Sequence, residues 1–237
     1  MFSHAFAAGA LLGTAISPLV CVSAAERSPV AAAEDVVARV TPSAKGSVLF
    51  HLNPDQGNKI TISGIAGGIR VEASDVRRLV AGYGWYLKNI AKVHFSWNGN
   101  RITLPSPLPV PASPVTVESP WNIVFAYNYC TLSYTAAFWD WNRWQREIDF
   151  LALNGFTHAL VTAGLEKTWE DFLTGLGYPR EKALRFIPNP AFAAWWNMGN
   201  LEGHGGPLSQ QQINKMAQMG RRIVSRMEQL GMTPVLQ

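Results

Sequence analysis

The sequence has few charged residues, and this shortage already excludes some classes of protein. Of its 237 residues, 15% are charged and 48% are hydrophobic, whereas about a quarter charged is usual for soluble proteins. A disordered chain would show the opposite balance, so the composition predicts a globular protein. The net charge of +4 comes without a block of Lys or Arg, which argues against a nucleic-acid partner.

Cysteine is also scarce. The chain has only Cys21 and Cys130, and Cys21 falls in a segment that we expect to be removed. Cys130 is then alone, so the mature chain has no intramolecular disulfide. The histidines outside that segment show no metal-ligand spacing, and we expect no metal site; they are His51, His94, His158 and His204.

Residues 1–24 are typical of an export signal, although the positive charge usual near its start is missing and only His4 stands there. The stretch Ala5–Val22 is small and apolar, and Val22-Ser23-Ala24 offers the small residues that a signal peptidase requires. A buried N-terminal helix is the alternative, and Pro18 argues against it. The apolar run is shorter than the roughly 20 residues of a membrane helix, so we predict an exported protein without a stable membrane span.

The next segments predict a flexible lead-in followed by a small domain. Residues 25–45 are rich in Ala, Pro and Ser and predict the lead-in. Residues 46–104 predict an α+β unit of strands around one helix. Two of its strands, Val48–Phe50 and Ile60–Ile62, flank turn residues and predict a hairpin. The others are a strand at 69–73, a helix at 76–90 capped by Ser74 or Asp75, and a second hairpin over 93–104.

Prolines then crowd residues 105–120, which predicts an extended linker and a domain boundary. Beyond it, over 121–237, strand and helix patterns alternate, as at the start of a parallel α/β fold. An open sheet and a β/α barrel look alike over three strands, and no Gly-rich phosphate motif favours the nucleotide-binding form. The expected elements are a fully buried strand at 123–127, a helix from Asp140, a strand at 157–162, helices at 166–176 and 209–230, and a strand at 232–236.

Few residues of the second domain point to chemistry by themselves. Asn128 follows the first strand, where functional side chains of a β/α barrel lie, but it can equally bond loop backbone. Glycosidases use two carboxyl groups, and the candidates Glu166 and Glu202 form no convincing pair. Glu166 equally suits the first turn of a helix. The first helix of the second domain carries three acidic residues, and they predict a solvated or salt-bridged face; they are Asp140, Glu147 and Asp149. Trp141 and Trp144 lie at helical spacing, which favours core packing. Trp195 and Trp196 fall in an irregular stretch that suits a sugar-binding pocket.

Several motifs in the second domain occur together in one known family. Tyr127-Asn128-Tyr129-Cys130-Thr131 and Trp139-Asp140-Trp141, followed by Arg146-Glu147-Ile148-Asp149, resemble the patterns of the α-N-acetylglucosaminidases, glycoside hydrolase family 89. The resemblance runs from about Asn122 to the last residue. The unit over 46–104 matches the family's small N-terminal domain only loosely.

This resemblance implies a fold and an activity. The fold is α/β, with a small α+β N-terminal domain followed by the first part of a (β/α)8 TIM-type barrel, incomplete in this chain. The activity is that of a retaining hydrolase that removes terminal α-linked N-acetylglucosamine from glycans without a cofactor. The family's catalytic glutamates have no counterpart among these residues, so we expect the chain alone to be inactive. The positions implied to bind substrate are Asn128, Cys130, Trp195 and Met198.

Two alternatives stay open, namely a non-catalytic carbohydrate-binding protein and an inactive truncated product. The chain has no Asn-x-Ser/Thr sequon. The absence of a sequon favours a periplasmic or secreted bacterial protein over a lysosomal one. For a eukaryotic source, a lysosomal protein is expected. The sequence predicts neither the oligomeric state nor the natural glycan.

Overall fold

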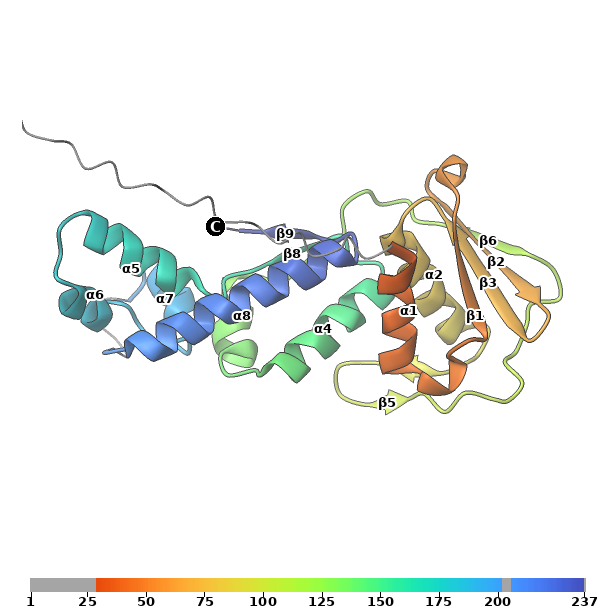
Figure 1. The fold of residues 1–237 in the computed structure, drawn as a ribbon, viewed down its shortest axis with the longest axis horizontal. Coiled ribbons are helices and arrows are strands. Elements are labelled where there is room, and N and C mark those ends of the chain that lie inside the picture. Colours follow the sequence, from red (N-terminus) through yellow and green to blue (C-terminus); the bar gives the residue numbers. More distant parts are fainter. Residues whose placement is uncertain (1–28, 202–205, 237) are drawn as a thin grey trace, which may run out of the picture.

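A computed structural model describes residues 29–201 and 206–236 of the chain (Figure 1). The predicted export signal lies outside the described residues, as does Glu202. None of the described helices combines the length and apolarity that a bilayer span requires. A four-stranded sheet with its helices forms one side of the molecule, the long helices α4 and α8 form the middle, and α5, α6 and α7 form the opposite side.

The N-terminal unit extends from the first described helix to the strand that precedes the barrel. Its sheet has the order β1-β3-β2-β6, and a separate hairpin joins β4 to β5. Its elements are α1 (Pro29–Val40), η1 (Pro42–Ala44), β1 (Val48–Leu52), η2 (Pro54–Gln56), β2 (Lys59–Ile65), β3 (Gly68–Ala73), α2 (Val76–Asn89), β4 (His94–Phe95), β5 (Asn100–Arg101) and β6 (Val115–Glu118).

The predicted flexible lead-in is wrong over most of its length, because α1 and η1 occupy it. The buried side of α1 consists of small apolar residues at three- and four-residue spacing, Ala33, Val36, Val37 and Val40. Alanine is the strongest helix former, and this composition therefore gives a helix that packs closely on α2. The Ala, Pro and Ser content predicts flexibility, whereas the buried apolar face of α1 stabilises the helix.

The predicted hairpin between the first two strands is also wrong. Strand β3 lies between them, parallel to β1 and antiparallel to β2. The turn at Ala66 and Gly67 closes β2 directly onto β3, and Gly67 supplies the positive φ of 82° that this turn requires. Since β3 takes the place beside β2, β1 pairs with the other edge of β3. The second hairpin is confirmed, with His94 opposite Arg101.

The proline-rich stretch packs on the N-terminal unit. Its last part, β6, pairs antiparallel with β2 at the edge of the sheet. Earlier in the stretch, the Pro109 carbonyl accepts a hydrogen bond of 2.9 Å from the buried Tyr86 hydroxyl. The stretch predicted as a linker therefore supplies a strand of the sheet.

The second part of the chain begins a parallel α/β fold. Strands β7, β8 and β9 form a parallel sheet, which confirms the predicted order of strands and connecting helices. Its elements are β7 (Phe125–Ala126), α3 (Tyr129–Thr131), the π-helical turn η3 (Leu132–Ala136), α4 (Trp141–Leu153), β8 (His158–Leu160), α5 (Leu165–Gly175), α6 (Arg180–Phe186), α7 (Ala193–Asn197), α8 (Gln210–Gln229) and β9 (Thr233–Val235).

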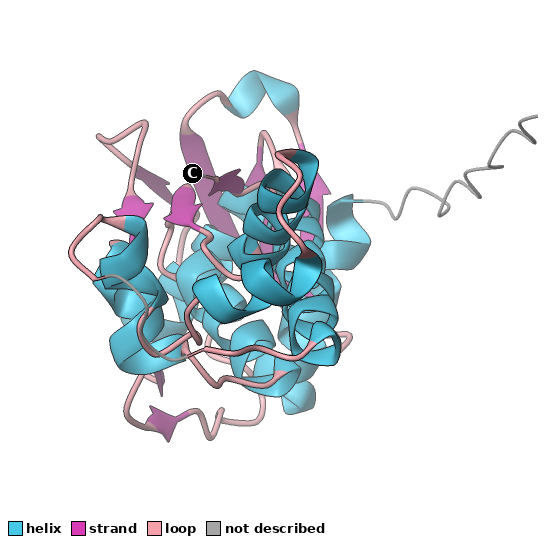
Figure 2. Cartoon of the chain, turned by 90° about the vertical axis from the view of Figure 1, so that its left-hand side faces the viewer, coloured by secondary structure: helices cyan, strands magenta, loops and turns pink. Residues whose placement is uncertain are grey.

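Two features of this part were not predicted. The first strand is short, and Ile123 and Phe125 are 65% and 48% exposed, so its apolar run is not buried on both faces. The short helices α3, α6 and α7 lie in stretches that lack a clear apolar period. Figure 2 shows how much of this half is helix and loop around few strands. The three longer helices begin as predicted, with Asp140 capping α4 and a Ser209–Gln212 capping box at α8.

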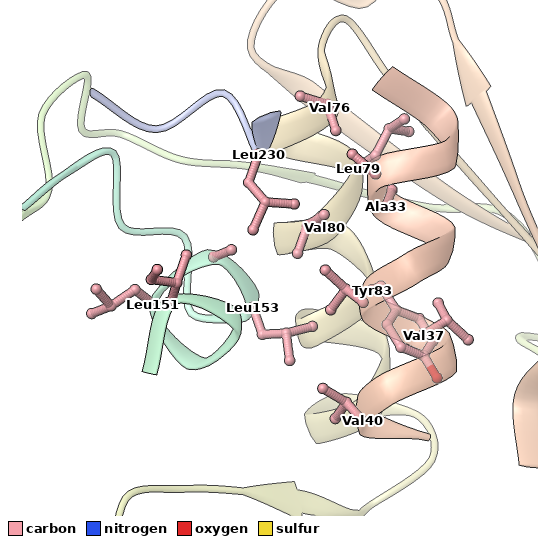
Figure 3. Packing of buried hydrophobic residues seen from close by; sticks show 14 of the residues in the cluster. Ala33, Val37, Val40, Val76, Leu79, Val80, Tyr83, Leu151, Leu153 and Leu230 are labelled. Atoms are coloured by element: carbon pink, nitrogen blue, oxygen red, sulfur yellow. The ribbon is translucent and has the colours of Figure 1, made fainter. Parts of the chain in front are cut away.

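The larger of the two apolar clusters among the described residues joins the two parts. It includes Tyr83 of α2, Leu153 of α4 and Leu230 after α8, all buried. Figure 3 shows their side chains converging between α1, α2 and α4. Because α2 packs directly on α4, the N-terminal unit holds the first barrel helix in place.

Candidate functional site

The carboxyl ends of β7 and β8 form the candidate site, as expected for a parallel α/β fold. Tyr127 and Asn128 follow β7, and Thr162 follows β8; all three line one small hollow. Its free volume is about 10 Å³, close to the minimum that a single water molecule needs. These residues therefore supply one wall of a site rather than an enclosed pocket.

Asn128 is exposed and caps α3. Its Oδ1 accepts hydrogen bonds of 3.1 Å from both the backbone N–H and the hydroxyl of Thr131, and the Thr131 side chain accepts from the Asn128 N–H in return. The local interpretation of Asn128 as a backbone-bonding residue is thus confirmed for its carbonyl oxygen. Among the described residues its amide nitrogen makes no hydrogen bond, so a donor remains for a ligand.

A buried carboxylate fixes the residue before Asn128. Glu147 is fully buried and accepts hydrogen bonds from the Tyr127 hydroxyl at 2.5 Å and from Trp97 Nε1 at 2.6 Å. Arg143 pairs with its second oxygen at 2.7 Å. Burial raises the pKa of Tyr127 well above its usual range, and the Glu147 charge raises it further. The hydroxyl therefore stays protonated and donates.

This network supports an unusual backbone conformation. Tyr127 has φ of 76°, in the left-handed region that non-glycine residues rarely adopt outside constrained sites. The Glu147 contact holds the Tyr127 side chain, and so directs the chain that leads to Asn128. Of the two alternatives for Glu147, a solvated face is wrong and a salt-bridged one is right. Sequence reasoning missed Tyr127 and Trp97, whose partner lies 20 and 50 residues away.

Cys130, Trp195 and Met198 lie on two neighbouring short helices. Cys130 is a half-buried free thiol on α3, and α3 packs against α7, which carries Trp195 and is followed directly by Met198. The Trp195 ring meets Tyr134 edge to face, with ring centroids 4.9 Å apart. Met198 is 39% exposed.

Ser133 fastens α7 to the turn that follows Cys130. Its hydroxyl donates to the Pro190 carbonyl at 2.9 Å and accepts from the Ala194 N–H at 3.0 Å. The structure therefore brings the four predicted residues into one region at the end of β7. Trp196, in contrast, packs on Trp169, with ring centroids 4.6 Å apart, and is part of the helical packing.

Glu166 forms a separate buried acidic position after β8. It is 4% exposed, stands in the first turn of α5, and accepts the Gly164 N–H at 3.1 Å. Burial raises the pKa of its carboxyl to about 7, partly offset by backbone hydrogen bonds. A cavity of about 160 Å³ between Trp139, Trp144 and α8 adjoins it. Within the described part of the chain, no three His, Cys, Asp or Glu side chains are grouped as metal ligands would be.

We expect Glu166→Gln to remove a pH dependence of stability. The folded pKa of about 7 exceeds the ordinary 4.5, so the folded state binds the proton more tightly. Protonation of Glu166 therefore stabilises the fold fully below pH 4.5, and this stabilisation is lost as the pH rises through the folded pKa of about 7. Relative to Glu166→Gln, the natural chain should lose roughly 2–3 kcal/mol of unfolding free energy between about pH 5 and about pH 8.

Urea unfolding at a series of pH values measures this difference. Glu181→Gln is the matched control, because Glu181 is 78% exposed and pairs only with Arg185 among the described residues. Parallel pH curves for the natural chain and Glu166→Gln would contradict the assignment.

The sequence matches two models of one family. The model described as the Alpha-N-acetylglucosaminidase (NAGLU) N-terminal domain covers residues 31–110, and the one described as the NAGLU tim-barrel domain covers residues 124–237. Human alpha-N-acetylglucosaminidase is 38% identical over 173 residues, which are 73% of this chain and 23% of the human protein.

Solved structures from Clostridium perfringens are similar as well. A family 89 glycoside hydrolase in complex with 2-acetamido-1,2-dideoxynojirmycin matches with a TM-score of 0.84 and 30% identity, over 88% of this chain and 24% of that chain. A variant with two glutamates replaced by glutamine, in complex with its substrate GlcNAc-alpha-1,4-galactose, matches with the same TM-score and 29% identity over the same shares. The chain thus spans about a quarter of the length of these relatives.

Proposed function

The chain belongs to the α-N-acetylglucosaminidase family of glycoside hydrolases, and from this membership we propose that it forms the N-terminal part of an enzyme that removes terminal α-linked N-acetylglucosamine from glycans. The α+β unit and the first three barrel strands match that family in order and in structure. The match in structure over 88% of the chain is the observation that carries this proposal. The activity belongs to a protein of which these residues are one part.

We propose that this part supplies one wall of the sugar pocket. The Asn128 amide nitrogen makes no hydrogen bond among the described residues, Cys130 lies two residues further along the chain, and Trp195 offers an aromatic face of the kind that packs on sugar rings. Met198 completes the wall from the end of α7. The Glu147 network and the Ser133 contacts hold these two segments in place, which limits the loss of entropy on binding.

We place the chemistry outside residues 1–237. A retaining glycosidase needs a nucleophilic carboxylate and an acid/base carboxyl about 5–5.5 Å apart, and the resemblance puts both on later strands of the barrel. Glu166 lies next to the wall, but its buried hydrogen bond to Gly164 supports a structural role. Export to the periplasm or the medium, based on the predicted signal at 1–24, is part of the same proposal.

Asn128 variants of the complete gene product test this role. Asn128→Asp keeps an acceptor for Thr131 but loses the amide donor, so we expect kcat/KM on an aryl α-N-acetylglucosaminide to fall by about tenfold or more with little change in stability. Asn128→Ala should lose the same activity and, in addition, about 1 kcal/mol of unfolding free energy, because the cap is gone.

The two variants separate binding from capping. If Asn128→Asp keeps full activity while Asn128→Ala loses it, then Asn128 acts through the helix cap alone. A gene product that binds N-acetylglucosamine without hydrolysing the aryl glycoside would instead favour the non-catalytic carbohydrate-binding alternative.

A further inference from the structure

A basic cleft lies on the side of the molecule, between α1, α4 and α8. It has a volume of about 430 Å³, within the range of small-molecule sites. Arg39 comes from α1 and Trp141 from α4, and α8 contributes Arg221, Arg222 and Arg226. The candidate sugar-binding wall, in contrast, lies at the carboxyl ends of β7 and β8, so the cleft is a different place on the fold.

The cleft has more positive than negative charge. Behind its floor Asp149, 2% exposed, accepts hydrogen bonds of 2.7 and 2.8 Å from Arg39 and one of 3.4 Å from Arg226. Asp35 is the other carboxylate at the cleft. Four guanidinium groups against two carboxylates leave two positive charges in excess. Over residues 29–201 and 206–236, Arg221 and Arg222 make no ion pair.

Two of these arginines are held in position and keep N–H groups that make no hydrogen bond within the described residues. The Arg222 guanidinium lies over the Trp141 ring, 4.1 Å from its centroid, and such stacking leaves the N–H edge of the group available. Arg226 is 5% exposed, and its contacts with Asp149 at 3.4 Å and with the Gln229 side chain at 3.3 Å are both long. Its Nε has no hydrogen-bond partner among the described residues. A buried guanidinium with so little compensation is costly without a further negative charge.

We propose that this cleft binds a tetrahedral oxyanion, a phosphate or sulfate group. Arginine presents a planar fork of N–H donors that matches two oxygens of such a group. The neutral amides that line the rest of the cleft can bond a molecule that carries the anion; they are Gln145, Gln218 and Gln229. The volume exceeds that of a single ion and accommodates an ester on a sugar. Hydrolytic activity plays no part in this proposal, so its failure would leave the proposed function untouched.

Titration calorimetry with inorganic sulfate and inorganic phosphate tests the cleft, at low ionic strength because salt screens exposed charges. Arg222→Gln removes an exposed donor of the cleft. Arg185→Gln is its matched control, because Arg185 on α6 is also exposed and pairs with Glu181 at 2.8 Å. Each variant loses one positive charge. We expect Arg222→Gln to weaken binding by about tenfold or more and Arg185→Gln by less than about twofold.

A sugar 6-phosphate and a sugar 6-sulfate, with the unmodified sugar as a blank, identify the carrier of the anion. Tighter binding of an ester than of its free ion assigns the site to a group on a sugar, and equal affinity assigns it to the free ion. Equal thermal midpoints for the two variants show that both are folded. Absence of binding by the natural chain up to about 10 mM of every anion, a concentration well above typical ligand affinities, or equal weakening in both variants, overturns the proposal.

Discussion

Replacing Asp149 by Ala is expected to lower the free energy of unfolding by about 3–5 kcal/mol, because it removes the one carboxylate shared by two arginines. Asp149 pairs with Arg39 at 2.7 Å and with Arg226 at 3.4 Å. Arg226 is buried, so the substitution removes its carboxylate partner and leaves only the neutral Gln229 side chain, at 3.3 Å, to accept from it. Arg39 belongs to α1, and the loss should therefore also loosen that helix.

Urea unfolding at about pH 8 measures the effect, since burial raises the pKa of Asp149 only to about 6, against the opposing effect of Arg39. Asp171→Ala is the matched control, because Asp171 is 63% exposed and paired with Lys167. An exposed pair contributes at most about 1 kcal/mol. A loss for Asp149→Ala no greater than that of Asp171→Ala would show that the buried pair carries little of the stability.

The second large effect is expected at the contact between α2 and α4. Gly84 lies so close to the end of α4 that a Cβ would stand 1.8 Å from the Leu153 carbonyl oxygen. Backbone atoms cannot rotate away, so Gly84→Ala must push the two helices apart. We expect a loss of roughly 3 kcal/mol or more of unfolding free energy, at the upper end of the usual overpacking range.

Gly175→Ala is the control for this substitution. Gly175 ends α5, and a Cβ there meets nothing within 4 Å. The change should be neutral or stabilise the chain by up to about 1 kcal/mol, because alanine favours the helix. If Gly84→Ala were as harmless as Gly175→Ala, then the close packing of the N-terminal unit on the first barrel helix would be wrong.

Local signals in the sequence predicted helices α2, α4, α5 and α8, but not α1 or the short helices α3, α6 and α7. Asp75, Asp140 and Ser209 each cap a helix where the pattern placed its start, because a cap and an apolar stripe depend only on residues within a few turns. The alternation of strands and helices in the second part followed from the same kind of signal. The distinction between an open sheet and a barrel did not, and came from the family resemblance.

What the sequence could not predict depends on distant contacts. Strand β1 pairs with β3 rather than β2, and Arg39 meets Asp149 across 110 positions. Tyr127, with its left-handed backbone, donates a hydrogen bond to Glu147, which also accepts one from Trp97 of the other unit. No local pattern marks such partners, so the sequence predicts only a solvated or salt-bridged face for the acidic residues of α4.

At the candidate site, the family resemblance indicates which residues to consider, and the structure shows that they lie close together. The segment of Asn128 and Cys130 at the end of β7 packs against the helix that carries Trp195 and is followed by Met198. Their contact with a sugar stays a prediction. Ser133 and Tyr127 hold this wall through hydrogen bonds to residues distant in the sequence, and no local pattern predicts them.

The most direct test compares two proteins in one assay, hydrolysis of an aryl α-N-acetylglucosaminide. One is the chain of residues 1–237, and the other is the complete product of the gene read past Gln237. If this chain supplies a pocket wall and later strands supply the glutamates, the complete product hydrolyses the α-glycoside but not its β-anomer, and residues 1–237 hydrolyse neither. Hydrolysis by residues 1–237 alone, or an inactive complete product, would contradict this account.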